Sequence, residues 1–114
     1  MAFSEVELKN IDEIVGGLCR RRNRPEFKDD LSLEFNVAGH DVVIFERRPK
    51  YGARVGVTDS PVAKLKFVRT QGEWRLFWRR QDLKWHGYGR LPSSKKLERL
   101  VDEVDRDPYG CFFG

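Results

Sequence analysis

Apolar residues recur with two different periods along this chain, and the first period is helical. Near the N-terminus the apolar residues are Leu8, Ile11, Ile14, Val15 and Leu18. This spacing places them on one face of a helix. Ser4 stands at an N-cap position and Glu7 at the reciprocal capping-box position. Arg20 to Asn23 suit a helix C-terminus, and Pro25 prevents further extension. The pattern therefore predicts an N-terminal helix that begins after Ser4 and ends before Pro25.

Between residues 31 and 47 the period changes to two, which is typical of a half-buried strand. Apolar and polar positions alternate through L-S-L-E-F-N-V, residues 31–37. A tight turn at Gly39-His40 would place Val37 opposite Val42 and Phe35 opposite Ile44. The sequence predicts a first hairpin over residues 31–47.

Residues 61–89 carry all three tryptophans and read as a three-stranded antiparallel meander. A two-residue turn at Gln71-Gly72 would set Leu65 opposite Trp78, and another at Gln81-Asp82 would set Trp78 opposite Trp85. Both turns assign the same residues to the apolar face, which supports the register because a one-residue slip exchanges the faces. We therefore expect Trp74, Trp78 and Trp85 in the core.

The remaining stretches complete the predicted order of elements. Residues 49–60, with two glycines and a bounding Pro61, read as a flexible basic loop. Leu91-Pro92-Ser93-Ser94 reads as the start of a second helix, which Asp107-Pro108 ends. Its apolar face comprises Leu97, Leu100, Val101 and Val104. The expected fold is α+β: an N-terminal helix, a five-stranded antiparallel sheet (hairpin plus meander) and a C-terminal helix, with both helices on one sheet face.

The last six residues, Y-G-C-F-F-G, are too apolar for a solvated tail. We expect them to fold back on the core, although an exposed aromatic end would also serve as a docking peptide.

Length and composition indicate one globular domain over residues 1–114, with 39% hydrophobic and 35% charged residues. Two cysteines fit a cytosolic protein with reduced thiols better than a disulfide scaffold. We expect no signal peptide, because the N-terminus lacks a basic region followed by a long apolar run. No apolar run is long enough to span a membrane, so no membrane partner is expected. The expected location is cytoplasmic.

Charge is unevenly distributed around a net value of +4. The sheet face opposite the predicted core would carry basic and aromatic residues: Lys64, Lys66, Arg75, Phe77, Arg79, Lys84, His86 and Tyr88. Cations that neutralise phosphates, interleaved with aromatic rings on which bases stack, are the elements of a single-stranded nucleic-acid platform. Alternatively these are ordinary solvated residues, or the second helix covers this face.

Further basic residues would extend that surface if the first helix's end and the loop lie beside it. They are Arg47 and Arg48, with Arg20, Arg21, Arg22, Arg24, Lys50 and Arg54. Otherwise the helix cluster is solubilising charge that also interacts with the helix dipole.

No cofactor or metal is expected, because two histidines without paired ligand spacing make no zinc signature. A non-catalytic module that binds single-stranded nucleic acid, RNA or another anionic partner is the leading hypothesis. A second is a protein-interaction adaptor that uses the C-terminal segment, or a sheet edge that pairs with a partner or with itself. A third is a nuclease-like enzyme around Asp41 and Glu46.

Several segments together resemble a known family. They include R-P-E-F-K-D-D-L-S-L-E-F, G-H-D-V-V-I-F-E-R-R-P, G-E-W-R-L-F-W-R-R-Q-D-L-K-W-H and the ending D-P-Y-G-C-F-F-G. The family comprises small bacterial proteins catalogued only as a domain of unknown function, and the resemblance covers nearly the whole chain. It implies a compact bacterial cytosolic protein and carries over no functional residue.

Overall fold

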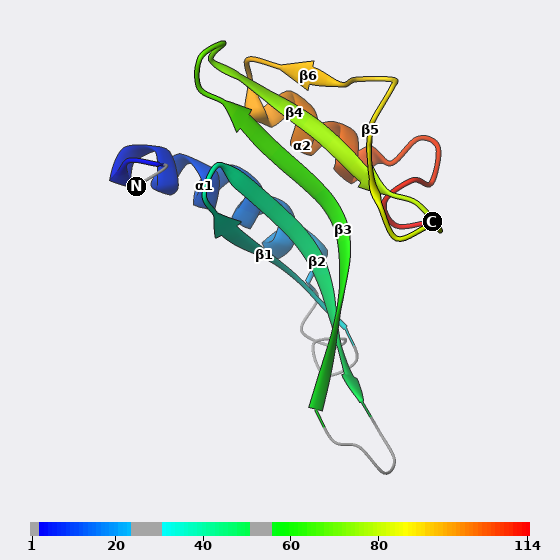
Figure 1. The fold of residues 1–114 in the computed structure, drawn as a ribbon. Helices are drawn as coiled ribbons and strands as arrows, with labels where there is room; N and C mark the ends of the chain where they lie inside the picture. Colours follow the sequence, from blue (N-terminus) through cyan, green and yellow to red (C-terminus); the bar gives the residue numbers. More distant parts are fainter. Residues whose placement is uncertain (1–2, 24–30, 51–55) are drawn as a thin grey trace.

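The computed structural model describes residues 3–23, 31–50 and 56–114, with Lys50 described only in its backbone. In these described residues two helices bracket six strands (Figure 1). In chain order the elements are α1 (Glu5–Arg22), β1 (Ser32–Ala38), β2 (Asp41–Lys50), β3 (Gly56–Val68), β4 (Glu73–Arg79), β5 (Trp85–Gly87), β6 (Ser93–Ser94) and α2 (Leu97–Arg106). The predicted α+β class, with a helix at each end of an antiparallel sheet, is confirmed.

The sheet is a meander in the order β1-β2-β3-β4-β5, and β6 pairs with Trp74 and Arg75 of β4, beside β5 on the same edge of β4. The first hairpin has the predicted register, with Val37 opposite Val42 and Phe35 opposite Ile44. Gly39 adopts a φ of 60° in its turn, a conformation that favours glycine. The two-residue turn therefore fixes which side of β1 and β2 faces the core.

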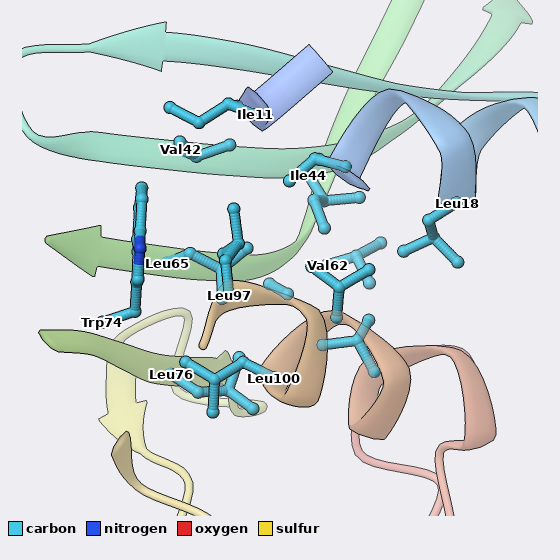
Figure 2. Packing of buried hydrophobic residues seen from close by; sticks show 14 of the residues in the cluster. Ile11, Leu18, Val42, Ile44, Val62, Leu65, Trp74, Leu76, Leu97 and Leu100 are labelled. Atoms are coloured by element: carbon cyan, nitrogen blue, oxygen red, sulfur yellow. The ribbon is translucent and has the colours of Figure 1, made fainter. Parts of the chain in front are cut away.

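Both helices pack on the same face of the sheet (Figure 1). The N-terminal helix contributes Ile11, Val15 and Leu18 to the core, all at most 1% exposed. Figure 2 shows Leu97 and Leu100 of α2 close to Leu65 and Leu76 of the sheet. The capping box predicted at Ser4 and Glu7 is present, and Phe3 just before it stacks on Trp74 with ring centroids 5.6 Å apart.

The turn between β3 and β4 is longer than the two residues that the sequence predicts. It occupies Arg69 to Gly72, where the Gln71 N–H donates to the Val68 carbonyl. As a result Leu65 pairs with Leu76 rather than with Trp78. Because the register moves by two residues, each side chain keeps its predicted face.

The turn between β4 and β5 also differs from the predicted turn, and its effect on the placement of side chains is larger. Arg80 and Lys84 close a three-residue loop, in which the Leu83 N–H donates to the Arg80 carbonyl at 2.9 Å. Leu83 has a φ of 63°, as expected for a type I turn completed by one left-handed residue. Trp85 consequently pairs with Arg79, and His86 pairs with Trp78. The predicted two-residue turn was wrong, and the odd loop length exchanges the faces of β5.

The described residues of the segment 49–60, which are 49–50 and 56–60, are strand and not part of the flexible loop that the sequence predicts. β2 continues to Lys50 and β3 begins at Gly56, whereas 51–55 lie outside the described residues. The far ends of these strands form a ribbon that projects beyond the helices (Figure 1). Arg47 and Asp59 are paired across it, with Arg47 Nε donating to Asp59 Oδ1 at 2.9 Å. Cross-strand pairing thus extends the hairpin without an underlying core.

The predicted helix start at residues 91–94 is also wrong. Ser93 and Ser94 form β6, and the Leu76 N–H donates to the Pro92 carbonyl, so this segment continues the sheet. The Ser94 hydroxyl accepts from the Lys96 N–H, which makes a local turn two residues before the helix begins. Leu97 is the first residue of α2, and Asp107 ends the helix as expected.

The C-terminal segment folds back on the core, as predicted. Phe112 is 7% exposed and lies 5.1 Å from the Tyr88 ring, measured between centroids. The Asp107 carboxylate accepts hydrogen bonds from the Phe112 and Phe113 N–H groups at 3.0 and 2.8 Å. Arg22 at the end of α1 places its guanidinium 3.7 Å from the Phe113 ring centroid. The segment thereby connects the two helices.

Two glycines inside α1 differ in their surroundings. A Cβ on Gly16 would lie 3.4 Å from the Phe35 ring, 3.0 Å from Arg20 Nη1 and 3.1 Å from Asp12 Oδ1, whereas one on Gly17 would meet only Arg21 Nη1 at 3.4 Å. We expect Gly17→Ala to raise the free energy of unfolding by about 0.5–1 kcal/mol, because alanine reduces the entropy lost on helix formation. Urea denaturation measures this. Gly16→Ala is the control and should gain less, and a destabilised Gly17→Ala variant would contradict the prediction.

Candidate nucleic-acid interface

The sheet face away from the helices is open. Pairing places Asn36, Val43, Lys64 and Phe77 in one row across β1 to β4 on this face. None of these residues is buried, and the same holds for the other residues that pairing assigns to this face within the described strands. Because α1 and α2 both cover the opposite face, the predicted alternative in which the second helix covers the basic face does not hold.

Five of the eight residues predicted for this face lie there. They are Lys64, Lys66, Arg75, Phe77 and Arg79, as their cross-strand partners show. Lys84 is exposed and lies directly before β5, where it closes the turn with Arg80. His86 and Tyr88 do not lie on the open face, because the three-residue turn reverses the faces of β5.

Tyr88 has a structural role on the helix side. It is 3% exposed, and its hydroxyl donates to Glu103 Oε2 of α2 at 2.7 Å. Burial, with the Glu103 hydrogen bond, raises the pKa of Tyr88 well above its usual value. Tyr88 is therefore not available for the base stacking that the sequence predicts. Instead its neutral phenol forms a hydrogen bond that connects the sheet to α2.

The same turn brings Trp85 to the open face, where sequence reasoning had not placed it. Its indole lies beside two cations, with Lys64 Nζ 5.4 Å and the Arg79 guanidinium carbon 5.9 Å from the ring centroid. Lys64 Nζ is also 5.0 Å from the Phe77 centroid. These four residues, Lys64, Phe77, Arg79 and Trp85, are called the Trp85 cluster below. At such distances each cation is attracted to the electron-rich ring face.

The electrostatics of the cluster favour an anionic ligand. In the part of the chain that the structure describes, no carboxylate lies within 4.0 Å of the charged atoms of Lys64, Arg79, Arg80 or Lys84. Nearby acids are already engaged. Hydrogen bonds from the Lys84 N–H and from His86 lower the pKa of Asp82, and Arg47 does the same for Asp59. Lys64 and Arg79 beside Trp85 thus have no ion-pair partner among the described residues, whereas Arg80 interacts electrostatically with Asp82.

Two open hollows lie on either side of Arg79 and Arg80. One, of about 560 Å³, is lined by Trp78, Gln81, Asp82, Gly110 and Cys111 as well as the arginines. The Arg80 guanidinium carbon lies 5.4 Å from the Trp78 ring centroid there. The other, of about 340 Å³, is also lined by Asp59, Ser60, Pro61 and Leu83. Both arginines therefore have space beside them for a ligand.

The opposite end of the open face is less suited to an anion. Arg75 donates to the Gln71 side chain at 3.0 Å and lies 3.6 Å from the Glu73 carboxylate. Asp41 is paired with Lys66 across the strands. Arg75 and Lys66 are thus on the predicted face but near neutralising or competing groups.

The predicted basic extensions are mostly structural. Arg47 pairs with Asp59 and Glu34 on the open face, and Arg48 pairs with Glu46. Arg21 and Arg22 pair with Asp105 of α2, and Arg20 donates to the Asp12 carbonyl. Arg24 and Arg54, and the side chain of Lys50, lie outside the described residues.

No arrangement typical of catalysis is seen among the described residues. Asp41 and Glu46 are five positions apart on β2, so their side chains point to opposite faces about 17 Å apart along the strand. No three His, Cys, Asp or Glu side chains within the described ranges gather as metal ligands. Burial raises the pKa of Cys19 to about 11 and also raises the pKa of Cys111, which is the opposite of the lowered pKa that activates a cysteine thiol.

The family assignment rests on nearly the whole chain. A family model described as a domain of unknown function (DUF3024) matches residues 3–114. The chain belongs to the DUF3024 family. The match spans both helices, all six strands and the Trp85 cluster of this DUF3024 chain, and it agrees with the resemblance that the sequence segments indicated. No curated protein and no solved structure matches the chain significantly.

Neither helix of the DUF3024 chain, over the residues that are described, is long and apolar enough to cross a membrane.

Proposed function

We propose that this DUF3024 domain binds single-stranded nucleic acid on its open sheet face, with the Trp85 cluster as the centre of the site. The observation that carries the proposal is the contact of Lys64 and Arg79, which have no ion-pair partner among the described residues, with partly exposed aromatic rings on an uncovered sheet. Bases would stack on Phe77 and Trp85. Phosphates would interact with Lys64 and Arg79, and with Arg80 and Lys84 at the rim.

A single strand fits this surface better than a duplex does. The bases of a duplex are stacked on one another, so their faces are not available to Phe77 and Trp85, whereas an unpaired base offers its whole face. The basic side chains alone would bind either form. The two aromatic rings therefore favour the single-stranded form.

Fluorescence anisotropy of a labelled single-stranded oligonucleotide tests the proposal, with the matching duplex titrated in parallel. We expect micromolar binding of the single strand that weakens with salt, with a log–log slope of about −0.7 for each phosphate contacted. Trp85→Ala should cost about 1–3 kcal/mol of binding free energy through lost stacking. Lys64→Glu with Arg79→Glu should weaken binding by about tenfold or more.

A matched control separates the site from the net charge. Lys9→Glu with Arg99→Glu makes the same change in charge on the exposed side of α1 and α2, so this pair should leave affinity nearly unchanged. Equal losses in the two double variants would show that only overall charge matters. Failure of the single strand to bind at low salt would overturn the proposal.

A further inference from the structure

β1 forms one edge of the sheet, and its backbone shows which groups face outward. It pairs with β2 on one side only among the described strands. On the other side the Asn23 side chain binds Leu33 twice, accepting from its N–H at 2.7 Å and donating to its carbonyl at 2.8 Å. Asn23 thus reproduces the pair of hydrogen bonds that a neighbouring antiparallel strand would make.

The outward direction of Leu33 fixes that of the rest of the edge. Antiparallel strands exchange hydrogen bonds at every second residue, so Phe35 and Val37 also point their N–H and carbonyl groups away from β2. In the described part of the chain no backbone hydrogen bond from another segment reaches these two residues. Four backbone groups at Phe35 and Val37 are therefore presented at the edge.

The edge lacks the features that usually prevent strand addition. β1 has seven residues, S-L-E-F-N-V-A, with no proline and no lysine, which are the common protections of edge strands. Its one charge, Glu34, lies 3.3 Å from the Arg47 guanidinium. Phe35 and Val37 pack against the core but remain partly exposed.

From this geometry we infer that β1 pairs antiparallel with β1 of a second copy, centred on Asn36. This register leaves the Asn23–Leu33 hydrogen bonds intact and uses only the outward groups of Phe35 and Val37. Phe35 would face Val37 of the second copy, and Asn36 would face Asn36. Glu34 would face Ala38, so no like charges oppose each other.

A hollow beside β1 supports pairing with a second copy of the chain. It has a volume of about 250 Å³ and is lined by Gly16, Cys19, Leu33 and Phe35 among others. Since Val37 of the second copy would lie directly opposite Phe35, its side chain would approach this hollow from the edge. The absence of a side chain on Gly16 keeps the hollow open.

Such a pair would form one continuous sheet of two meanders. Antiparallel neighbours are related by an axis perpendicular to the sheet, so the open faces of both copies would point in the same direction. The Trp85 side chains of the two copies would then be separated by nine strand spacings, roughly 40 Å. A sufficiently long strand could contact both, which raises its apparent affinity without new contacts.

Sedimentation equilibrium of the whole chain, without nucleic acid, tests the pairing. We expect a monomer–dimer equilibrium that Val37→Pro abolishes, because proline removes an outward N–H while no hydrogen bond within the described chain is lost. Circular dichroism would show that Val37→Pro is folded. A monomer at every concentration, or a dimer that Val37→Pro does not weaken, would overturn the inference.

Charge substitutions at Asn36 provide a second, gentler test. Asn36→Lys and Asn36→Asp each place like charges opposite each other and should each weaken the dimer, by up to about fivefold. Mixing the two variants should restore association as heterodimers. Asn10→Lys, at an exposed position of α1, is the matched control and should not change association. Heterodimers no more abundant than chance would contradict the proposed register, whatever the result for nucleic-acid binding.

Discussion

Substituting Trp74 with alanine is expected to lower the free energy of unfolding by about 3–5 kcal/mol. The Trp74 side chain is 8% exposed. It stacks on Phe3 and lies 5.0 Å from Phe67, measured between ring centroids. Its loss would leave a cavity where the N-terminal segment meets the sheet. Because a domain of this size is stable by only about 5–15 kcal/mol, the variant would be close to unfolding, as urea denaturation would show.

The other two tryptophans are internal controls for this prediction. Trp85→Ala should cost about 1 kcal/mol, because the indole is on the open face and loses little buried area. Trp78 packs against the core but lines a hollow, so its substitution should fall between these values. Equal losses for Trp74 and Trp85 would place both rings in the core and would reject the register of β5.

Substituting Asp107 with alanine is expected to cost about 3 kcal/mol. The carboxylate accepts two backbone hydrogen bonds from the C-terminal segment, and hydrogen bonds to charged groups contribute about 1.5–3 kcal/mol each. Asp107 also has a φ of 45°, which aspartate tolerates better than alanine does. The urea midpoint measures the total loss.

The reactivity of the Cys111 thiol would show whether the stability lost in Asp107→Ala comes from release of the C-terminal segment. Burial and the Asp107 charge raise the pKa of Cys111, so in the native protein this thiol should react slowly with a disulfide reagent. Release of the segment in Asp107→Ala should accelerate the reaction of Cys111 while Cys19 stays buried and slow. Asp107→Asn retains one acceptor and should be intermediate, whereas Asp102→Ala, an exposed acid of α2, should behave like the native chain. Unchanged midpoint and reactivity in Asp107→Ala would show that the carboxylate does not hold the segment.

Local signals in the sequence were sufficient for the helices and the first hairpin. Ser4 and Glu7 form the capping box that their spacing predicted, because such a box involves only groups one helical turn apart. Gly39 likewise determines the first turn within two residues. The α+β class and the side on which the helices pack followed from these elements and from the alternation of apolar residues.

The second turn of the meander could not be predicted in this way. A left-handed residue in a turn is usually glycine or asparagine, but here it is Leu83, whose φ is 63° and which is 70% exposed. Sequence propensity therefore gave no indication that the turn has three residues. Because of the wrong turn length, the sequence predicted Trp85 in the core and Tyr88 on the open face, whereas the structure has Trp85 on the open face and Tyr88 in the core. The candidate site was therefore only partly predicted. Lys64 on β3 and Phe77 and Arg79 on β4 were placed correctly, because the register between these two strands differs from the predicted one by an even number of residues.

The three-residue turn also determines how other members of the DUF3024 family should be compared with this chain. Insertion or deletion of one residue between Arg80 and Lys84 would shift the register of β5 by one residue, so that each of its side chains would move to the other face of the sheet. A relative with the shorter turn would carry an aligned tryptophan on its helix side, and its following residue would occupy the open face. Sequence identity at position 85 is therefore not enough to transfer the site. The length of the preceding turn must match as well.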